Sequence, residues 1–236
     1  MATIRIMPFG DSMTASDWLG GYRAKLKPHM TTAGFLTDYV GSQNANAYAI
    51  PLDPDYEAFF GWTLLQLADN IGPAHNKTIE QQMDTYTPDL IIMQGGTNDL
   101  NNGSWTPAQC VQHYEALLDR ILAHSPTVKV IALNCTPMGL SLETLNNLIN
   151  QFNPLLVTMV AARGSRVTYC DWAVGMNRTT DLTGDDVHPT DAGYVKMTDN
   201  LWPVVNTVLS GTPTVTTIYA DGTLGANITN GTYSIA

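Results

Sequence analysis

Short apolar runs alternate with longer segments of helical spacing along most of the chain. The runs are rich in branched residues and have the length of buried strands, and they cover residues 3–8, 37–41, 90–94, 128–134 and 167–171. Apolar residues recur every three or four positions in segments 62–71, 107–124, 142–162 and 190–209. Strands that alternate with helices form a parallel sheet covered on both faces. We therefore predict an α/β fold with a central parallel five-stranded sheet.

The pattern changes beyond residue 209. Residues 210–236 are rich in Thr, Gly and Asn with alternating apolar positions, and Asp221-Gly222 and Asn230-Gly231 are hairpin-type turn pairs. We predict one main domain over residues 1–209 and a β-hairpin tail over 210–236. The tail is too small for a core of its own, so it either packs on the main domain or begins a further module.

The composition and net charge of the chain indicate which classes of binding partner to expect. The 236 residues are 44% hydrophobic, only 14% are charged, and the net charge is -10. Phosphate backbones and anionic membranes would be repelled on average, so we expect neither nucleic acid nor a membrane as partner. No apolar stretch approaches the roughly 20 residues that span a bilayer. The N-terminus lacks a signal-peptide pattern, which leaves both an internal location and secretion after signal removal open. The oligomeric state is not predicted.

The three cysteines, Cys110, Cys135 and Cys170, lack the spacing of a metal site. Two of them fall in predicted core strands. We expect small buried hydrophobic side chains rather than a reactive thiol.

A serine follows the first predicted strand directly. The strand leads into Gly10-Asp11-Ser12-Met13-Thr14, in which the glycine permits a tight turn. Such a turn delivers the Ser12 hydroxyl to the carboxyl edge of a parallel sheet, where reactive groups collect. The alternative is a serine that caps the next helix. The Gly-x-Ser-x-Gly elbow of α/β-hydrolases is absent, because Thr14 stands at its second glycine.

Two further strand ends carry polar side chains. Gly95-Gly96-Thr97-Asn98-Asp99 follows the third strand, and the Asn98 amide there could either stabilise an oxyanion beside Ser12 or serve an ordinary turn. Asp185-Asp186-Val187-His188-Pro189 follows the fifth strand, and Pro189 keeps His188 extended on a constrained loop. Asp185 can hold one imidazole nitrogen while the other faces a serine hydroxyl. The remaining histidines are expected on solvated helices.

Taken together, these blocks resemble the SGNH (GDSL-type) hydrolase superfamily. Its motifs stand here in the family's order as Gly10-Asp11-Ser12, Gly61, Gly96-Thr97-Asn98-Asp99 and Asp185 to His188, over roughly residues 3–209. Met13 replaces the usual Leu or Ile, and Gly72 is an alternative for the glycine block. The resemblance implies a three-layer α/β/α sandwich of the flavodoxin-like SGNH type, with residues 1–209 as its catalytic domain.

The resemblance also implies a mechanism. His188 removes the Ser12 proton, Ser12 attacks an ester carbonyl, and Asp185 orients the imidazole. The oxyanion hole would consist of the backbone N–H groups of Ser12 and Gly61 and the Asn98 amide, each typically worth ~3 kcal/mol. This chemistry needs no cofactor and no metal.

Within the superfamily the sequence is most similar to carbohydrate esterase family 3, the acetyl xylan esterases. The likeness rests on Gly20-Gly21-Tyr22-Arg23, Gly61-Trp62 and the Gly-Asp-Asp-Val-His-Pro block that ends at Pro189. It implies an acetylated carbohydrate or another small ester as substrate. Candidate substrate contacts are the side chains Asp11, Tyr22, Arg23, Trp62 and Trp105, although core packing for the aromatic rings and an ion pair for Arg23 are alternatives.

Two other functions remain open. The same fold and catalytic set serve general short-chain esterases, lysophospholipases and thioesterases, because they do not determine the leaving group. A non-catalytic carbohydrate-binding or phage-structural module would explain the polar β-rich tail, but it would not need Ser12, Asn98, Asp185 and His188 together.

Overall fold

The five predicted apolar runs form strands of one parallel sheet. A computed structural model describes residues 2–16, 19–44, 53–69, 77–103 and 105–211. Across the sheet the strands are ordered β2 (Thr37–Tyr39), β1 (Ile4–Gly10), β4 (Leu90–Met93), β5 (Lys129–Leu133) and β6 (Val167–Cys170). All neighbouring pairs are parallel, with Phe9 opposite Met93 and Met93 opposite Ala132. The predicted sheet is confirmed.

One strand was not predicted. β3 (Glu57–Ala58) also pairs in parallel with β1, at Phe9 and Gly10, beyond the point where β2 ends. Two residues are too few to show a periodicity, so no pattern could indicate this strand. It matters for the site because it brings the segment after Ala58 beside the carboxyl end of β1.

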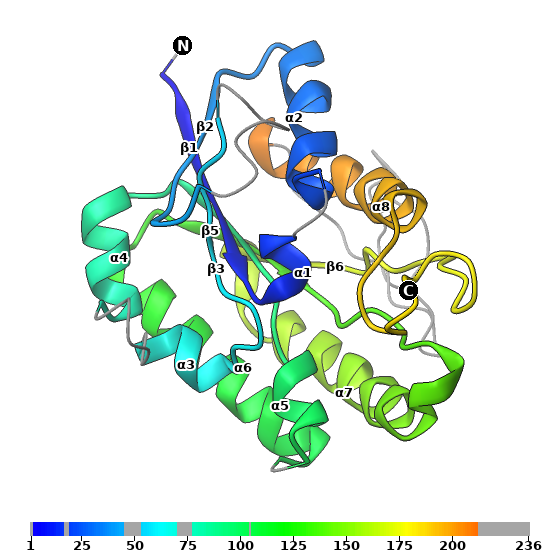
Figure 1. Ribbon diagram of the computed structural model, residues 1–236. Helices are drawn as coiled ribbons and strands as arrows, with labels where there is room; N and C mark the ends of the chain where they lie inside the picture. Colours follow the sequence, from blue (N-terminus) through cyan, green and yellow to red (C-terminus); the bar gives the residue numbers. More distant parts are fainter. Residues whose placement is uncertain (1, 17–18, 45–52, 70–76, 104, 212–236) are drawn as a thin grey trace, which may run out of the picture.

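Helices cover both faces of the sheet (Figure 1). One face carries α2 (Gly21–Thr32) and α8 (Asp191–Leu209), which contact each other. The other carries α3 (Leu64–Asp69), α4 (Ile79–Tyr86), α6 (Pro107–His124) and α7 (Glu143–Ala161). Short helices α1 (Ser12–Ala15) and α5 (Thr97–Asn101) follow β1 and β4, and two 3-10 turns are η1 (Leu140–Leu142) and η2 (Gly164–Arg166). This is the predicted three-layer α/β/α sandwich.

Most predicted helices have the expected bounds. α6 begins and ends as predicted, and Thr106 caps it, because the Gln109 N–H donates to the Thr106 hydroxyl over 3.3 Å. α7 is one residue shorter at each end, and α8 begins after its cap Thr190. α3 begins two residues later than predicted. α2 escaped prediction because it opens with a glycine and contains Pro28, both poor helix signals.

The sheet core explains the unbroken apolar runs. Both faces of a central parallel strand are covered, so β4 has no polar alternation, and Ile91 and Ile92 are fully buried. Burial of each such side chain contributes about 1.5–3 kcal/mol. The strands are therefore a stable base for the residues at their carboxyl ends.

The strand order reverses direction at β1. The chain passes from β1 to β2 on one side and later adds β4, β5 and β6 on the other. In open α/β sheets, ligands bind at such a switch point, outside the carboxyl ends of the strands. Ser12 and Asn98 follow the two strands that meet there.

The predicted division at residue 209 coincides with the end of α8 at Leu209. From residue 212 the tail lies outside the described residues, so the β-hairpin tail stays a prediction.

Candidate active site

The nucleophile candidate lies in the first turn of α1. Asp11, not Ser12, caps this helix, because the Met13 N–H donates to Asp11 Oδ1 over 2.9 Å. The capping alternative for Ser12 is therefore wrong. A Cβ on Gly10 would lie 2.5 Å from the Gln94 carbonyl oxygen, so only glycine lets β1 end this close to β4.

Asp11 and Gln94 form a buried reciprocal pair. The Asp11 N–H donates to Gln94 Oε1 over 3.2 Å, and Gln94 Nε2 donates to Asp11 Oδ2 over 3.0 Å. Burial raises the pKa of Asp11 to about 6, although hydrogen bonds from Met13 and Gln94 oppose this. The pair fixes the turn that presents Ser12, and sequence analysis missed Gln94 because glutamine at a strand end carries no motif.

His188 and Asp185 lie on a closed loop, here called the histidine loop (residues 181–190). Leu182 and Pro189 form an antiparallel bridge at its base. The Thr183 N–H donates to the His188 carbonyl over 2.8 Å, and the Thr190 N–H donates to the Asp181 carbonyl over 2.8 Å. The imidazole is therefore carried by a loop whose two limbs are hydrogen-bonded to each other.

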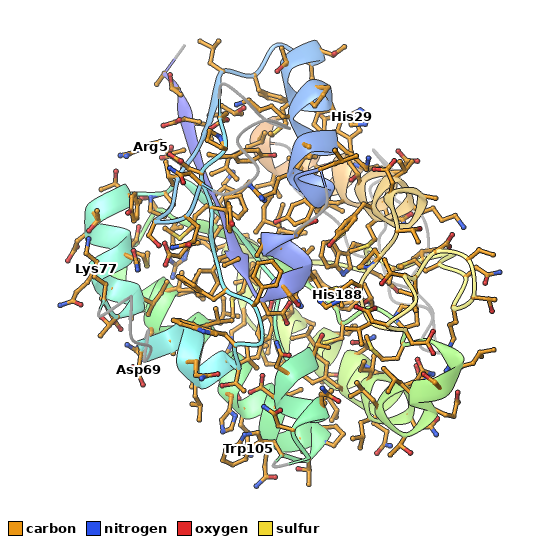
Figure 2. The ribbon with its side chains drawn as sticks, viewed as in Figure 1. Arg5, His29, Asp69, Lys77, Trp105 and His188 are labelled. Carbon is orange, nitrogen blue, oxygen red and sulfur yellow. The ribbon has the colours of Figure 1, made fainter. Side chains whose placement is uncertain are left out.

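Ser12, His188 and Asp185 form one continuous chain of contacts. His188 Nε2 lies 2.8 Å from Ser12 Oγ, and His188 Nδ1 lies 2.6 Å from Asp185 Oδ2. Figure 2 shows His188 beside α1. Asp185 Oδ1 also accepts the Val187 and His188 N–H groups, each over 2.9 Å. The structure thus brings together the three residues predicted as a catalytic set.

The charge of Asp185 is favoured by its partners. Partial burial raises its pKa, but hydrogen bonds from His188 and Thr183 and from two backbone N–H groups outweigh burial and hold the pKa well below its ordinary value. An ionised Asp185 keeps the proton of His188 on Nδ1, which leaves Nε2 free to accept one from Ser12.

Gly61 and Asn98, predicted to complete the oxyanion hole with Ser12, follow β3 and β4, and both strands pair with β1. The Phe59 N–H donates to the Gly10 carbonyl over 3.0 Å, and Gly61 follows two residues later in an exposed left-handed turn with φ of 76°. Asn98 lies in α5, and its Nδ2 donates to the Trp62 carbonyl over 2.9 Å. An amide has two N–H groups, so one remains for an oxyanion.

Asp99 braces the same loop. It is fully buried, and the Leu64 N–H donates to its Oδ2 over 3.0 Å. Asn98 and Asp99 thus hold the residues that follow Gly61, and the Phe59 N–H bond to Gly10 holds the residues before it. His113 lies 3.9 Å from Asp99, with its side chain only 18% exposed, which corrects the expectation that it is a solvated helix residue.

Three predicted substrate contacts are enclosed by protein. Tyr22 and Arg23 are fully buried, and Asp11 is 1% exposed. The Arg23 guanidinium donates to the carbonyls of Thr14, Ala15 and Pro54 and stacks on Tyr56. Tyr22 packs edge-on against Trp172. The structure thus places these three side chains inside the fold and not on the surface of the site, with hydrogen bonds there to Asp11 and from Arg23.

The two tryptophans differ in position. Trp62 is half-buried next to Gly61, and its ring stacks on Phe59 with 4.0 Å between centroids. Trp105 lies well away from His188 in Figure 2 and packs edge-on against His113. Trp105 thus lies apart from the histidine loop, whereas Trp62 lies next to the predicted oxyanion-hole residue Gly61.

The other predicted features concern cysteines, metals and membranes. Cys110, Cys135 and Cys170 are buried free thiols, as expected. Within the described residues, no group of three or more His, Cys, Asp or Glu side chains is arranged to hold a metal ion. None of the described helices is long and apolar enough to cross a membrane.

Ser12 follows β1, the histidine loop follows β6, and Gly61 and Asn98 follow β3 and β4. This is the placement that the sequence predicts for a hydrolase of the SGNH type on a flavodoxin-like sheet. Residues 9–196 match the model of the GDSL-like Lipase/Acylhydrolase family. The chain belongs to this family, which confirms the resemblance found in the sequence.

Known relatives agree with this family. The chain is 30% identical over 215 residues to a multidomain esterase of Ruminococcus flavefaciens, a match that spans 83% of this chain and 27% of that protein. A family 3 carbohydrate esterase of Clostridium thermocellum is similar in structure, with a TM-score of 0.73, 28% identity, and coverage of 89% of this chain and 98% of the other. A family 3 carbohydrate esterase of Talaromyces cellulolyticus shares the fold, with a TM-score of 0.74 and 24% identity; the match covers 89% of this chain and 99% of the other.

Proposed function

We propose that this chain is a serine esterase that removes short acyl groups, above all acetyl, from carbohydrate such as acetylated xylan. The observation that carries the proposal is the chain of contacts from Asp185 through His188 to Ser12, at 2.6 and 2.8 Å. These distances are within the reach required of a base and its nucleophile.

The proposed reaction has two halves. His188 Nε2 takes the Ser12 proton as Oγ bonds to the ester carbonyl carbon, and the same proton then passes to the departing alcohol oxygen as that bond breaks. Water repeats the sequence on the acyl-serine: His188 takes a water proton, the hydroxyl bonds to the carbonyl carbon, and Ser12 leaves with the proton. Asp185 stays ionised throughout and stabilises the imidazolium.

The developing oxyanion needs hydrogen-bond donors. In this proposal they are the N–H groups of Ser12 and Gly61 and the second N–H of Asn98. The support is positional: Gly61 lies in the turn that follows β3, Asn98 lies in α5 after β4, and both strands pair with β1. Asn98 and Asp99 hold the Gly61 turn before substrate arrives, and such preorganisation gives donors their catalytic value.

The carbohydrate assignment rests on likeness and on the loop surface. The Clostridium thermocellum structure that is 28% identical is named a family 3 carbohydrate esterase. The half-buried Trp62 beside Gly61 offers the kind of aromatic side chain on which sugar rings stack.

Two measurements test the proposal. Ser12→Ala should abolish hydrolysis of nitrophenyl acetate with an unchanged melting temperature, because the substitution removes only the hydroxyl that attacks. Wild-type kcat/KM should fall steeply along nitrophenyl esters from two to eight acyl carbons, since added methylenes meet a wall, and acetate should be released from acetylated xylan. A folded, active Ser12→Ala would refute the serine mechanism. A rise with chain length, at roughly 0.8 kcal/mol per methylene, together with an inert xylan would refute the carbohydrate assignment and indicate a general esterase, lysophospholipase or thioesterase.

A further inference from the structure

Asp186 has an unusual backbone conformation between the two predicted catalytic residues of the histidine loop. Its φ is +60°, a left-handed value that is uncommon in residues other than glycine. Such a conformation persists only where surrounding contacts hold it. One contact of Asp186 is local, because its N–H donates to the Thr183 carbonyl over 3.0 Å. The others come from a distant part of the chain, the 138–141 turn (residues 138–141), which lies between β5 and α7.

Both the side chain and the backbone of Asp186 bind this turn. Asp186 Oδ2 accepts the Ser141 N–H over 3.0 Å and also the Ser141 hydroxyl. The Asp186 carbonyl accepts the Gly139 N–H over 2.7 Å. These hydrogen bonds hold the pKa of Asp186 below its ordinary value, so the carboxylate is ionised when the loop is in place.

Arg178 provides a second connection to the same turn. Its guanidinium donates to the carbonyls of Met138 and Gly139 and forms an ion pair with Glu143, at the start of α7. Arg178 and Asp186 both belong to the connection between β6 and α8. The 138–141 turn is therefore held from two sides, and it in turn holds the residue next to Asp185.

We propose that Asp186 is a positioning residue, which fixes the histidine loop on the 138–141 turn so that Asp185 and His188 keep their alignment with Ser12. The inference rests on the proposed serine mechanism. Asp186 itself does not contact Ser12 or the imidazole. It acts by holding the backbone of the histidine loop, whose Val187 and His188 N–H groups donate to Asp185. A misplacement of about 1 Å can cost on the order of 100-fold in rate.

Gly139 makes the proposal sharply testable. A Cβ at Gly139 would lie 2.1 Å from Asp186 Cγ and 2.4 Å from Asp186 Cβ, and its three nearest atoms all belong to that side chain. Gly139→Ala should therefore push Asp186 out of place in the otherwise wild-type protein. It should do little in an Asp186→Gly background, where those atoms are absent. Two substitutions that act through one contact are not additive.

The experiment measures turnover of nitrophenyl acetate per active site, with sites counted by a serine-directed phosphonate, together with KM and the melting temperature. Asp186→Gly relieves the backbone strain yet removes the carboxylate, and kcat should fall roughly 10- to 100-fold with KM nearly unchanged. Asp186→Asn keeps an acceptor oxygen and tolerates the left-handed conformation, so it should recover most of the kcat that Asp186→Gly loses. Asp191→Asn, on the surface three residues after His188, is the matched control and should be unaffected.

A purely structural role would lower the melting temperature or the number of active sites without changing kcat per site. Wild-type turnover per site in Asp186→Gly, or a Gly139→Ala loss that is equally large in both backgrounds, would overturn the positioning role. If either outcome were found while Ser12→Ala was inactive in the same assays, only the positioning role of Asp186 would fall and the serine mechanism would stand. An active Ser12→Ala would overturn both.

Discussion

Asn98→Ala should separate catalysis from stability. The Asn98 amide has two N–H groups, and the structure commits one of them to the Trp62 carbonyl at 2.9 Å. Loss of this bond should cost about 1 kcal/mol of folding free energy, a fall of about 2–4 °C in melting temperature for a chain of this size. Loss of the second N–H should raise the barrier by about 2.7–4 kcal/mol, which is a 100- to 1,000-fold fall in kcat.

Thr63→Ala supplies the matched control for the stability part. Thr63 caps the start of α3 with Gln66 and lies next to Trp62, but its hydroxyl donates to Gln66 Oε1 over 3.1 Å. Its removal should cost about 1 kcal/mol and leave kcat nearly unchanged. Turnover on nitrophenyl acetate and urea unfolding of both variants give the comparison. Equal kcat values for Asn98→Ala and Thr63→Ala would show that Asn98 is only a tether for the Gly61 turn.

Three further predictions follow from buried polar groups. The free energy of unfolding of wild type, relative to that of Asp11→Asn, should fall by about 2 kcal/mol as pH rises from 4 to 6. The reason is that the pKa of folded Asp11 is raised to about 6, so the folded state holds the proton to higher pH than the unfolded state does; urea unfolding at each pH would contradict this if the difference stayed constant. Arg23→Lys should lower stability by about 3 kcal/mol or more, since one ammonium nitrogen cannot reach three carbonyls that Nε, Nη1 and Nη2 of the guanidinium bind separately, and a melting temperature near that of wild type would refute it. All three cysteine thiols should be inert to a thiol reagent in the folded enzyme, because burial raises their pKa values; fast labelling without unfolding would contradict this.

The sheet and the motifs of the site could be predicted from the sequence because each is visible in a few consecutive residues. A buried parallel strand reads as an unbroken apolar run, as in β4, and the residue after it must lie at the carboxyl edge. Asp185 and His188 are three residues apart and share one loop, so their mutual reach could be inferred before the fold was known. Only the contact with Ser12, 176 positions away, needed the topology.

The failed predictions concern residues whose partners are distant in sequence. Gly20-Gly21-Tyr22-Arg23 has the composition of a surface loop, yet Tyr22 and Arg23 lie in the first turn of α2, on its buried side. Arg23 is stabilised there by carbonyls such as that of Pro54, 31 positions away. No local pattern distinguishes such an arginine from one that meets a substrate, because its burial is decided by tertiary packing.

The alignment of His188 with Ser12 depends on more than their own contact. The histidine loop continues into α8, where the buried Tyr194 hydroxyl donates to the Met13 carbonyl over 3.2 Å. α8 thus contacts the turn of Ser12 through Tyr194, six residues after His188. The segment that carries His188 is therefore connected to the segment that carries Ser12 by two separate hydrogen bonds, His188 to Ser12 and Tyr194 to Met13. Asp186 holds the opposite side of the loop on the 138–141 turn. A loop fixed on both sides loses little further freedom when substrate binds, which is the condition under which preorganised groups lower a barrier.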